Sequence, residues 1–193
     1  MNRKEQHEKR RQEILIVALD LFIHKGYDAT KIQDIAQAAD MSVGLLFHYF
    51  KSKEKLYEEL VILGKTGPQT YLSTIKENSL DFFRTAVKDI IQFIKTEPFV
   101  AKMFVLMKQA YCNYAGPESI KKMLAENESI TLSVEKIRQG QKDGTIKEGD
   151  PVALANMFWS AFQGIVEHFT LSMHDIPIPD SECIIDILRR RDL

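Results

Sequence analysis

The stretch KIQDIAQAADMSVGLLFHYF, residues 31–50, decides how the N-terminal part of this chain folds. Its first half carries apolar residues at the three- and four-residue spacing of one helical face: Ile32, Ile35, Ala36 and Ala39. The pattern then breaks over residues 40–42. The first half of the stretch therefore predicts a short amphipathic helix that ends in a turn.

A second short helix is predicted after this turn. Ser42 is a good N-cap, because its hydroxyl can accept a hydrogen bond from a free amide of the next turn. Leu46 and Phe50 lie four residues apart and predict the buried side of the helix. The other side is largely apolar and aromatic, which indicates contact with a partner. Two short helices around a tight turn form a helix-turn-helix, whose second helix enters the major groove of DNA.

The composition indicates an ordinary helical protein. The 193 residues are 45% hydrophobic and 27% charged, with only nine glycines and six prolines. Long amphipathic runs dominate and alternating segments are scarce, so we expect an all-α fold of about nine helices. The length accommodates a three-helix head and a larger helical body for ligand binding and dimerisation, which we place at residues 1–53 and 54–193.

Local signals predict several helix boundaries. Gly26 follows a lysine and is expected to end the first helix, and Thr30 is the expected N-cap of the next one. The helix after the motif is expected to end near Gly64, with Gly67-Pro68 as a break in the chain. One long helix is expected over residues 118–139, and Asp150-Pro151 is a strong start for another.

The net charge of −1 conceals an asymmetry between these two regions. Residues 1–53 carry nine Lys and Arg against seven Asp and Glu, whereas residues 54–193 carry seventeen against twenty. The modest positive charge of the head has the sign that DNA binding needs. The basic residues before Glu13 are either a solvated helix face or contacts for DNA phosphates.

The sequence contains no recognisable catalytic or metal-binding motif. The five histidines form no pair four residues apart, and a Gly-rich phosphate loop, a nucleophile elbow and an HExxH motif are missing. Cys112 and Cys183 lie far apart without the spacing of a metal site. We therefore expect no enzyme activity, no cofactor and no bound metal.

The cytoplasm is the expected location of the chain. Its N-terminus lacks the apolar segment of a signal peptide, and the two isolated cysteines fit a reducing compartment. The most apolar stretch, residues 152–171, contains Asn156, Gln163, Glu167 and His168 and is expected to be a buried helix rather than a membrane span. A helix that is apolar on nearly every side must be covered on every side, so we expect a second subunit to pack on it.

Short matches between residues 13 and 60 have the order and spacing of a known family. They are Ala18, Leu21, Phe22, Lys25-Gly26-Tyr27, Ala29-Thr30, Asp34-Ile35-Ala36, Ala38-Ala39, Ser42-Val43-Gly44, Leu46, Phe50 and Ser52-Lys53-Glu54. In these residues the chain resembles the N-terminal domain of the TetR family of transcriptional regulators. The segment from Gly144 to Gly164 resembles the C-terminal part of the same family less specifically. This resemblance implies a homodimer in which the last two helices of each subunit form a four-helix bundle.

The resemblance also places the second helix of the motif in the major groove of double-stranded DNA. The residues that it implies for DNA contact are Thr30, Gln33, Ser42, Val43, Gly44, Leu45, Phe47, His48, Tyr49 and Lys53. Gln33 and His48 can read base edges, whereas Thr30 and Lys53 are expected near phosphates. Because the second helix holds no Arg or Lys, we expect modest affinity per half-site and a dependence on dimerisation.

Three positions depart from the family pattern. The turn position that is usually Gly is Asp40, which adopts a left-handed backbone at a higher cost. Phe47 stands where Tyr is usual and lacks its hydroxyl, and Tyr49 stands where His is usual. These departures keep an alternative open, in which the chain is a helical ligand- or protein-binding module whose helix-turn-helix no longer reads DNA.

A small-molecule pocket in the body, which changes the spacing of the two heads when filled, is a further implication of the resemblance. The candidate lining residues are Phe83, Phe104, Met107, Lys108, Tyr111, Trp159, Phe162, Gln163 and His168. Aromatic and Met residues at helical spacing equally fit an ordinary apolar core. Buried polar side chains in apolar helices need hydrogen-bond partners, which are one another, the second subunit or a ligand. The resemblance thus implies a ligand-responsive repressor that binds a palindromic operator as a dimer and is released by a small, mainly apolar effector.

Overall fold

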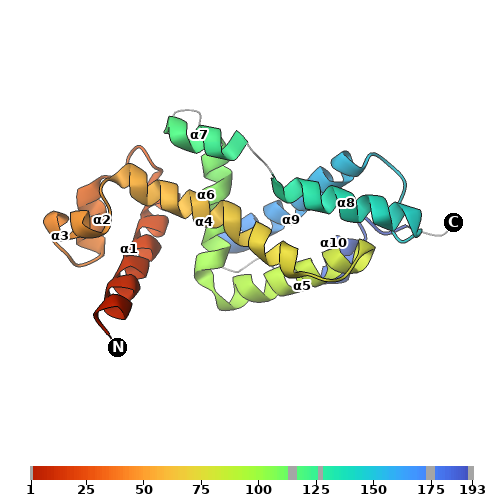
Figure 1. The fold of residues 1–193 in the computed structure, drawn as a ribbon, viewed down its shortest axis with the longest axis horizontal. Coiled ribbons are helices and arrows are strands. Elements are labelled where there is room, and N and C mark those ends of the chain that lie inside the picture. The colour runs from red at the N-terminus through yellow and green to blue at the C-terminus, as the bar shows by residue number, and fades with distance from the viewer. Residues whose placement is uncertain (1, 113–116, 126–127, 173–176, 191–193) are drawn as a thin grey trace. The chain divides into compact units, whose positions relative to one another are not determined.

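The computed structural model describes residues 2–112, 117–125, 128–172 and 177–190, and it confirms the all-α class (Figure 1). The helices of these residues are α1 (Arg3–Lys25), α2 (Ile32–Ala38), α3 (Val43–Tyr49), α4 (Lys53–Thr74), α5 (Ser79–Thr96), α6 (Pro98–Cys112), α7 (Glu118–Ala125), α8 (Glu128–Lys142), α9 (Pro151–Leu171) and α10 (Ser181–Ile185). An isolated β-bridge pairs Ile146 with Arg189. Across the described ranges, every helix is too short or too polar to cross a membrane.

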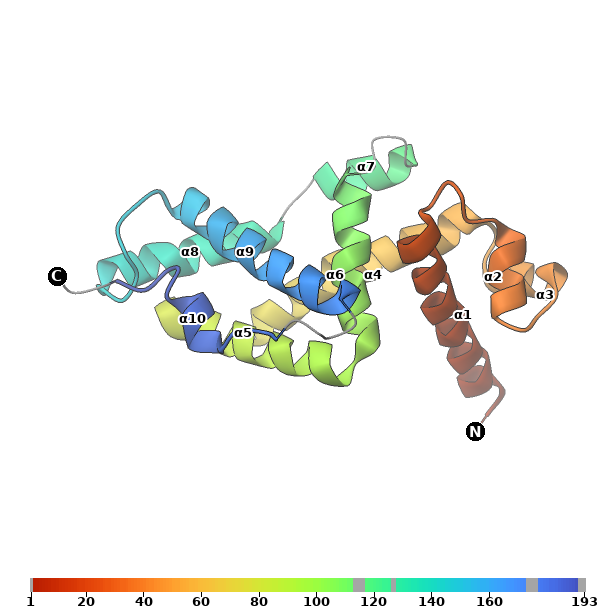
Figure 2. The ribbon, with the colours of Figure 1, turned by 180° about the vertical axis from the view of Figure 1, so that it is seen from behind.

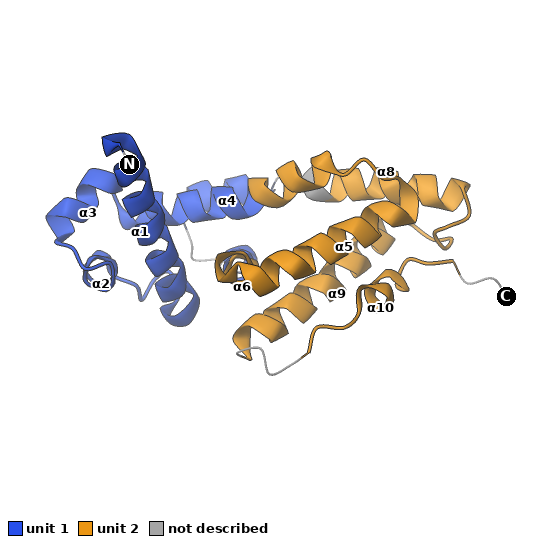
Figure 3. Cartoon of the chain, turned by 90° about the horizontal axis from the view of Figure 1, so that it is seen from below, with its two compact units in different colours: residues 1–65, 105–125 blue, residues 66–104, 126–193 orange. Residues whose placement is uncertain are grey.

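The chain divides into two compact units (Figure 3). Unit 1 contains residues 1–65 and 105–125, and unit 2 contains residues 66–104 and 126–193. α4 and α6 each contribute one part to each unit, so neither helix belongs to one unit alone. The functional division into head and body at residue 53 stays a prediction.

The head has a small apolar core to which all three of its helices contribute. From α1 the core takes the buried side chains of Ile14, Leu15, Ala18, Leu19 and Phe22. α2 adds Ile35 and Ala36, and Gly26 ends α1, as predicted, with a φ of 80° that suits glycine. The predicted burial of Leu46 and Phe50 is confirmed, since they are 0% and 3% exposed. Burying two such side chains contributes about 1.5–3 kcal/mol each and attaches α3 to the head.

The helix that follows the motif is longer than the sequence predicts. We expect it to end near Gly64, with Gly67 and Pro68 as a break, but α4 continues through Pro68 to Thr74. A proline inside a helix loses one backbone hydrogen bond, and its ring crowds the carbonyl oxygen one turn earlier as well as the backbone N–H and Cβ of the preceding residue. Gly67 has no Cβ, so the steric part of the penalty is reduced and the helix continues.

The single helix predicted over residues 118–139 is two helices in the structure. α7 belongs to unit 1 and α8 to unit 2, and residues 126–127 between them lie outside the described part of the chain. α7 buries Ile120 and Leu124, and α8 buries Val134 and Ile137. The prediction of one helix is wrong because the apolar residues of both segments recur at helical spacing. That spacing does not show that α7 and α8 pack into different cores.

Unit 2 is a bundle in which α8 packs against both α5 and α9, and α10 packs against α5 (Figure 2). α9 begins as predicted: the Asp150 carboxylate accepts a hydrogen bond from the Ala153 amide at 2.7 Å, and Pro151 follows the cap. The largest fully buried side chains of this core are Phe82, Phe83, Phe158, Phe162 and Ile94. These residues make α5 and α9 the main contributors to the core.

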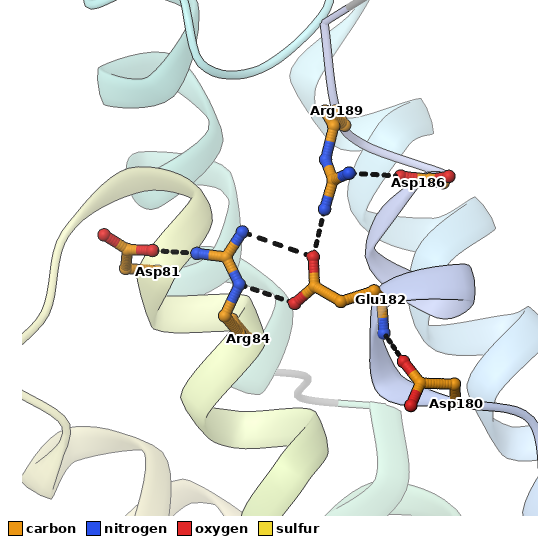
Figure 4. Close-up of polar contacts among 6 residues, drawn as sticks. All are labelled: Asp81, Arg84, Asp180, Glu182, Asp186 and Arg189. Atoms are coloured by element: carbon orange, nitrogen blue, oxygen red, sulfur yellow. Dashed lines mark hydrogen bonds and ion pairs between the residues drawn. The ribbon is translucent and has the colours of Figure 1, made fainter.

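The short α10 is attached to α5 by ionic contacts (Figure 4), and buried apolar residues of the two helices share one core. The Arg84 Nε lies 2.7 Å from the Glu182 carboxylate, which also pairs with Arg189. The hydrogen bond from Arg84 is the main reason why the pKa of the Glu182 carboxyl is lowered. Because Arg84 and Glu182 are 37% and 45% exposed, solvent screens this network, so the buried apolar residues carry more of the attachment: Ile184, Ile185 and Leu188.

Candidate nucleic-acid interface

α3 presents an exposed face opposite the buried Leu46. The Ser42 hydroxyl accepts a hydrogen bond from the Leu45 amide at 3.1 Å, so the predicted N-cap is confirmed. Leu45 and Phe47 are large apolar side chains, yet they are 45% and 46% exposed. The other groove candidates are exposed (Gln33, Ser42, Gly44 and His48) or half-buried (Val43 and Tyr49). All of the α3 candidates thus lie on one short, exposed helix.

The turn between α2 and α3 is strained at Asp40 and held by Arg10. The φ of Asp40 is 51°, in the left-handed region that favours glycine. The Arg10 Nη2 donates to the carbonyl oxygens of Ala39 at 2.7 Å and Asp40 at 3.3 Å. A cation at the C-terminal end of a helix also interacts favourably with the helix dipole. Arg10 therefore stabilises the turn in which Asp40 replaces the usual glycine.

Arg11 makes a second long-range contact from α1. Its guanidinium pairs with the Glu59 carboxylate of α4, 48 residues away in sequence, and lies 4.8 Å from the Phe50 ring centroid. Arg10 and Arg11 are thus structural residues. The other basic residues of the N-terminal run, Arg3, Lys4 and Lys9, are exposed and remain candidates for phosphate contact. The sequence does not show which of these basic residues are structural and which are free to contact phosphates, because a local pattern gives no information on contacts between residues distant in the chain.

Thr30 and Lys53 hold the connection between α1 and α2 together. Thr30 is predicted to be the N-cap of α2, but the cap position belongs to Lys31, and Thr30 is 1% exposed. The Thr30 hydroxyl donates to the Gly26 carbonyl oxygen at 2.7 Å. The Lys53 ammonium donates to the carbonyl oxygens of Tyr27 at 2.7 Å and Thr30 at 2.9 Å. Both side chains have internal partners, and their phosphate contacts stay a prediction.

His7 is a neighbour of α3 that sequence reasoning missed. Its ring is stacked on that of Tyr49, with centroids 4.7 Å apart and an interplanar angle of 24°. Such pairs contribute about 0.5–1.5 kcal/mol beyond area burial. The N-terminal turns of α1 therefore support the end of α3. The departure at Tyr49 has a structural consequence here, because its ring provides the stacking surface.

Five of the predicted effector residues gather in unit 2. Four of them are aromatic, and their rings meet edge-on or at a tilt. The ring centroids of Phe83 and Trp159 are 6.4 Å apart, those of Trp159 and Phe162 are 6.1 Å apart, and those of Phe104 and Phe162 are 6.2 Å apart. The Gln163 amide donates to the Phe104 carbonyl oxygen at 2.9 Å. We call these five residues, Phe83, Phe104, Trp159, Phe162 and Gln163, the aromatic cluster.

The remaining predicted effector residues are not part of this cluster. Met107, Lys108 and Tyr111 belong to the segment of α6 in unit 1, and Lys108 is exposed. His168 is exposed on α9. The polar pair Gln163 and Glu167 meets within α9, since the Gln163 amide donates to the Glu167 carboxylate at 2.6 Å. Two of the polar side chains in apolar helices therefore satisfy each other.

The comparisons with known proteins agree with this geometry. The model of the family described as bacterial regulatory proteins, tetR family, matches residues 14–60. The uncharacterized HTH-type transcriptional regulator YhgD of Bacillus subtilis is 30% identical over 145 residues, which are 74% of this chain and 74% of that protein. The chain belongs to the TetR family. A TetR-family chain is a DNA-binding transcriptional regulator and not an enzyme.

Two further proteins are similar to this TetR-family chain, one in the sequence of its head and one in its fold. The repressor KstR2 of Mycolicibacterium smegmatis is 44% identical over 52 residues, which are 27% of this chain and 25% of KstR2. The crystal structure of AibR in complex with isovaleryl coenzyme A and operator DNA has a TM-score of 0.69 at 20% identity, covering 92% of this chain and 94% of AibR. At that identity the likeness to AibR supports the fold.

We predict that Asp40→Gly stabilises the protein by about 0.5–1 kcal/mol. Glycine adopts a φ near 51° without a Cβ penalty, and the bonds from Arg10 go to backbone oxygens that the substitution keeps. Urea unfolding measures the change. Asp40→Ala is the control, because it removes the carboxylate but keeps the Cβ, and it should give no gain. An equal gain from both variants would assign the effect to charge and contradict the backbone explanation.

Proposed function

We propose that this protein is a repressor that binds a near-palindromic operator as a homodimer and is released by a small, mainly apolar effector. The observation that carries the proposal is the exposed face of α3, where Leu45 and Phe47 stay open to solvent while Leu46 and Phe50 anchor the helix. An exposed apolar face on a short, firmly anchored helix fits contact with base edges and thymine methyl groups in the major groove.

Positive charge for DNA binding comes from outside α3. Arg3, Lys4 and Lys9 are exposed on α1, and Lys31 and Lys51 are exposed on either side of the motif. Lysine and arginine that neutralise phosphates contribute affinity that does not depend on sequence and falls as salt rises. Specificity would then depend on Gln33, His48 and the apolar side chains of α3. This arrangement favours reading of DNA over the alternative of a module that no longer reads it.

We predict that selection from random-sequence DNA enriches one near-palindrome with half-sites about 34–36 Å apart or somewhat more. Combining Gln33→Ala with His48→Ala should reduce discrimination at the contacted base pairs by about 1–3 kcal/mol each, because hydrogen bonds to base edges are lost. Binding is measured by mobility shift at several salt concentrations.

Gln92→Ala is the matched control, since Gln92 is exposed on α5 and has no predicted DNA role. It should leave sequence preference unchanged. Failure to enrich any sequence, or a double variant with unaltered preference, would refute the DNA-reading function and favour the alternative.

The dimer contact that we propose uses the outer face of α9 together with α8. Val152, Met157 and Leu171 are 45%, 44% and 58% exposed, although α9 buries its opposite side. Between them lie exposed small residues at helical spacing: Ala153, Ser160 and Gly164. Apolar side chains mixed with small residues allow two helices to approach closely, and covering them stabilises the pair.

We predict that Gly164→Arg converts the dimer into a monomer in sedimentation velocity. A Cβ at Gly164 meets nothing within 4 Å in the isolated chain, so the subunit should keep its fold while the helix pairing is blocked. Ser73→Arg, at an exposed position of α4, should remain dimeric. A Gly164→Arg protein that remains dimeric would contradict this interface.

We place the effector at the aromatic cluster of unit 2. Trp159 is the single tryptophan of the chain, and its indole donates to the Ser133 hydroxyl at 2.8 Å. AibR, which shares the fold, is bound to isovaleryl coenzyme A in its operator complex. A ligand that inserts between these rings would separate α9 from α5 and α6. This movement would couple effector binding to the affinity for operator DNA.

We predict that apolar compounds which lower operator affinity also change the fluorescence of Trp159 over the same concentration range. The coupling should be about 1–3 kcal/mol, or roughly 5- to 150-fold in operator affinity. Trp159→Phe assigns the signal, because it removes the single tryptophan and should lose the fluorescence change; since Trp159 belongs to the proposed site, it should also shift the concentration of compound that releases DNA. A compound that releases DNA without affecting Trp159 would place the effector site elsewhere.

A further inference from the structure

Unit 1 contains a cavity that the proposed function does not use. Its volume is about 430 Å³, within the range of small-molecule sites, and it is lined by the end of α1, residues 26–29, α4 and the end of α6. The wall is formed mainly by Phe22, Tyr27 and Tyr57, with Gln109 and Cys112 contributed by α6. None of these residues belongs to the aromatic cluster of unit 2.

Three aromatic rings form one continuous wall of this cavity. The Tyr57 ring meets that of Phe22 edge-on, with centroids 5.1 Å apart and an angle of 82°, and lies 4.6 Å from that of Tyr27. Aromatic rings attract further aromatic groups in offset or edge-on arrangements. The wall therefore suits a flat aromatic ligand.

The two tyrosine hydroxyls of the wall lack hydrogen-bond partners among the described residues. Tyr57 is only 3% exposed, and neither it nor Tyr27 forms such a bond with its hydroxyl. Tyr71 of unit 2 differs, because its hydroxyl donates to the Asp89 carboxylate at 2.6 Å. Burial raises the pKa of Tyr57 to about 12, so the hydroxyl is protonated at neutral pH and is a donor. The Tyr57 hydroxyl is itself accessible to solvent, so it can donate to an acceptor on a ligand in the cavity instead of to solvent.

The charges around the cavity disfavour an anion. The Lys25 ammonium is paired with Asp34 at 3.2 Å, and that of Lys53 is bound by backbone carbonyl oxygens. Asp28 lines the cavity without an ion pair to any described residue, and its charge contributes to the raised pKa of both tyrosines after the larger effect of burial. The Lys53 ammonium keeps its charge and lies 4.1 Å from the Tyr27 ring centroid, but the carboxylates of Asp28 and Glu54 both act on Tyr27, so the negative charges near the wall outnumber this cation and repel an anionic ligand.

We propose that this cavity is a second small-molecule site, separate from the proposed effector site, and that it takes a neutral aromatic compound carrying a hydrogen-bond acceptor. Tyr57 and Tyr27 donate to the acceptor, and the aromatic wall packs against the ring system. The Gln109 amide already donates to the Ile23 carbonyl oxygen at 3.0 Å, which ties α6 to α1. A ligand held between the same two helices strengthens this link and stabilises unit 1.

The probe for this site is 2-naphthamide, tested by calorimetry and thermal unfolding on the full-length protein. We expect saturable binding with a dissociation constant of about 1 mM or lower and a raised unfolding midpoint. The anion of the same shape, 2-naphthoate, should bind at least roughly tenfold more weakly because of Asp28. Equal or tighter binding of 2-naphthoate, or no saturable binding of 2-naphthamide, overturns the proposal.

Matched variants locate the probe. Tyr57→Phe should weaken 2-naphthamide binding roughly five- to tenfold, whereas Tyr71→Phe, which removes a hydroxyl in unit 2, should leave it unchanged. Cys112→Trp should abolish binding by filling the cavity, and Cys112→Ser should retain it. Because Cys112 is exposed at the end of α6, both variants should fold. If neither Tyr57→Phe nor Cys112→Trp alters binding, the probe binds elsewhere and the proposal is wrong.

Discussion

The orientation of the recognition helix depends on the burial of Leu46 and Phe50 in the core of the head. α3 has only seven residues, too few to be stable as an isolated helix, so its conformation comes from this anchoring and from the Ser42 cap. Because both anchors face inward, Leu45 and Phe47 must face outward on the same helix. The exposed apolar face is thus a direct geometric consequence of the buried one.

α1 supplies the contacts that make this anchoring specific. Arg10 binds the carbonyl oxygens at the end of α2, Arg11 pairs with Glu59 beside the Phe50 ring, and His7 stacks on Tyr49. Three side chains within two turns of one helix therefore contact the turn, the core and the end of the motif. Cations that resemble DNA-binding residues in the sequence stabilise the protein instead, and the exposed lysines and arginines around the motif are left for phosphates.

Unit 2 shows a similar division of one helix between two roles. The inner side of α9 contributes Phe158 and Phe162 to a closely packed core, and its outer side leaves Met157 and Leu171 exposed. Several aromatic residues that we expect at the effector site pack against one another. An effector at this position would have to separate rings that now touch, which would convert binding energy into movement of the helices. The open cavity of unit 1 requires no such separation.

Local spacing in the sequence determined the helices, the caps at Ser42 and Asp150, the end of α1 at Gly26 and the inward direction of Leu46 and Phe50. These features depend on residues at most four positions apart, so period and side-chain chemistry are sufficient to predict them. The tertiary structure alone decided that Arg10 and Arg11 are structural, that α4 passes Pro68, that α7 and α8 belong to different units, and that Tyr27, Tyr57 and Cys112 share a cavity. These features join residues that are distant along the chain, and their pairing is set by packing, which no local pattern records.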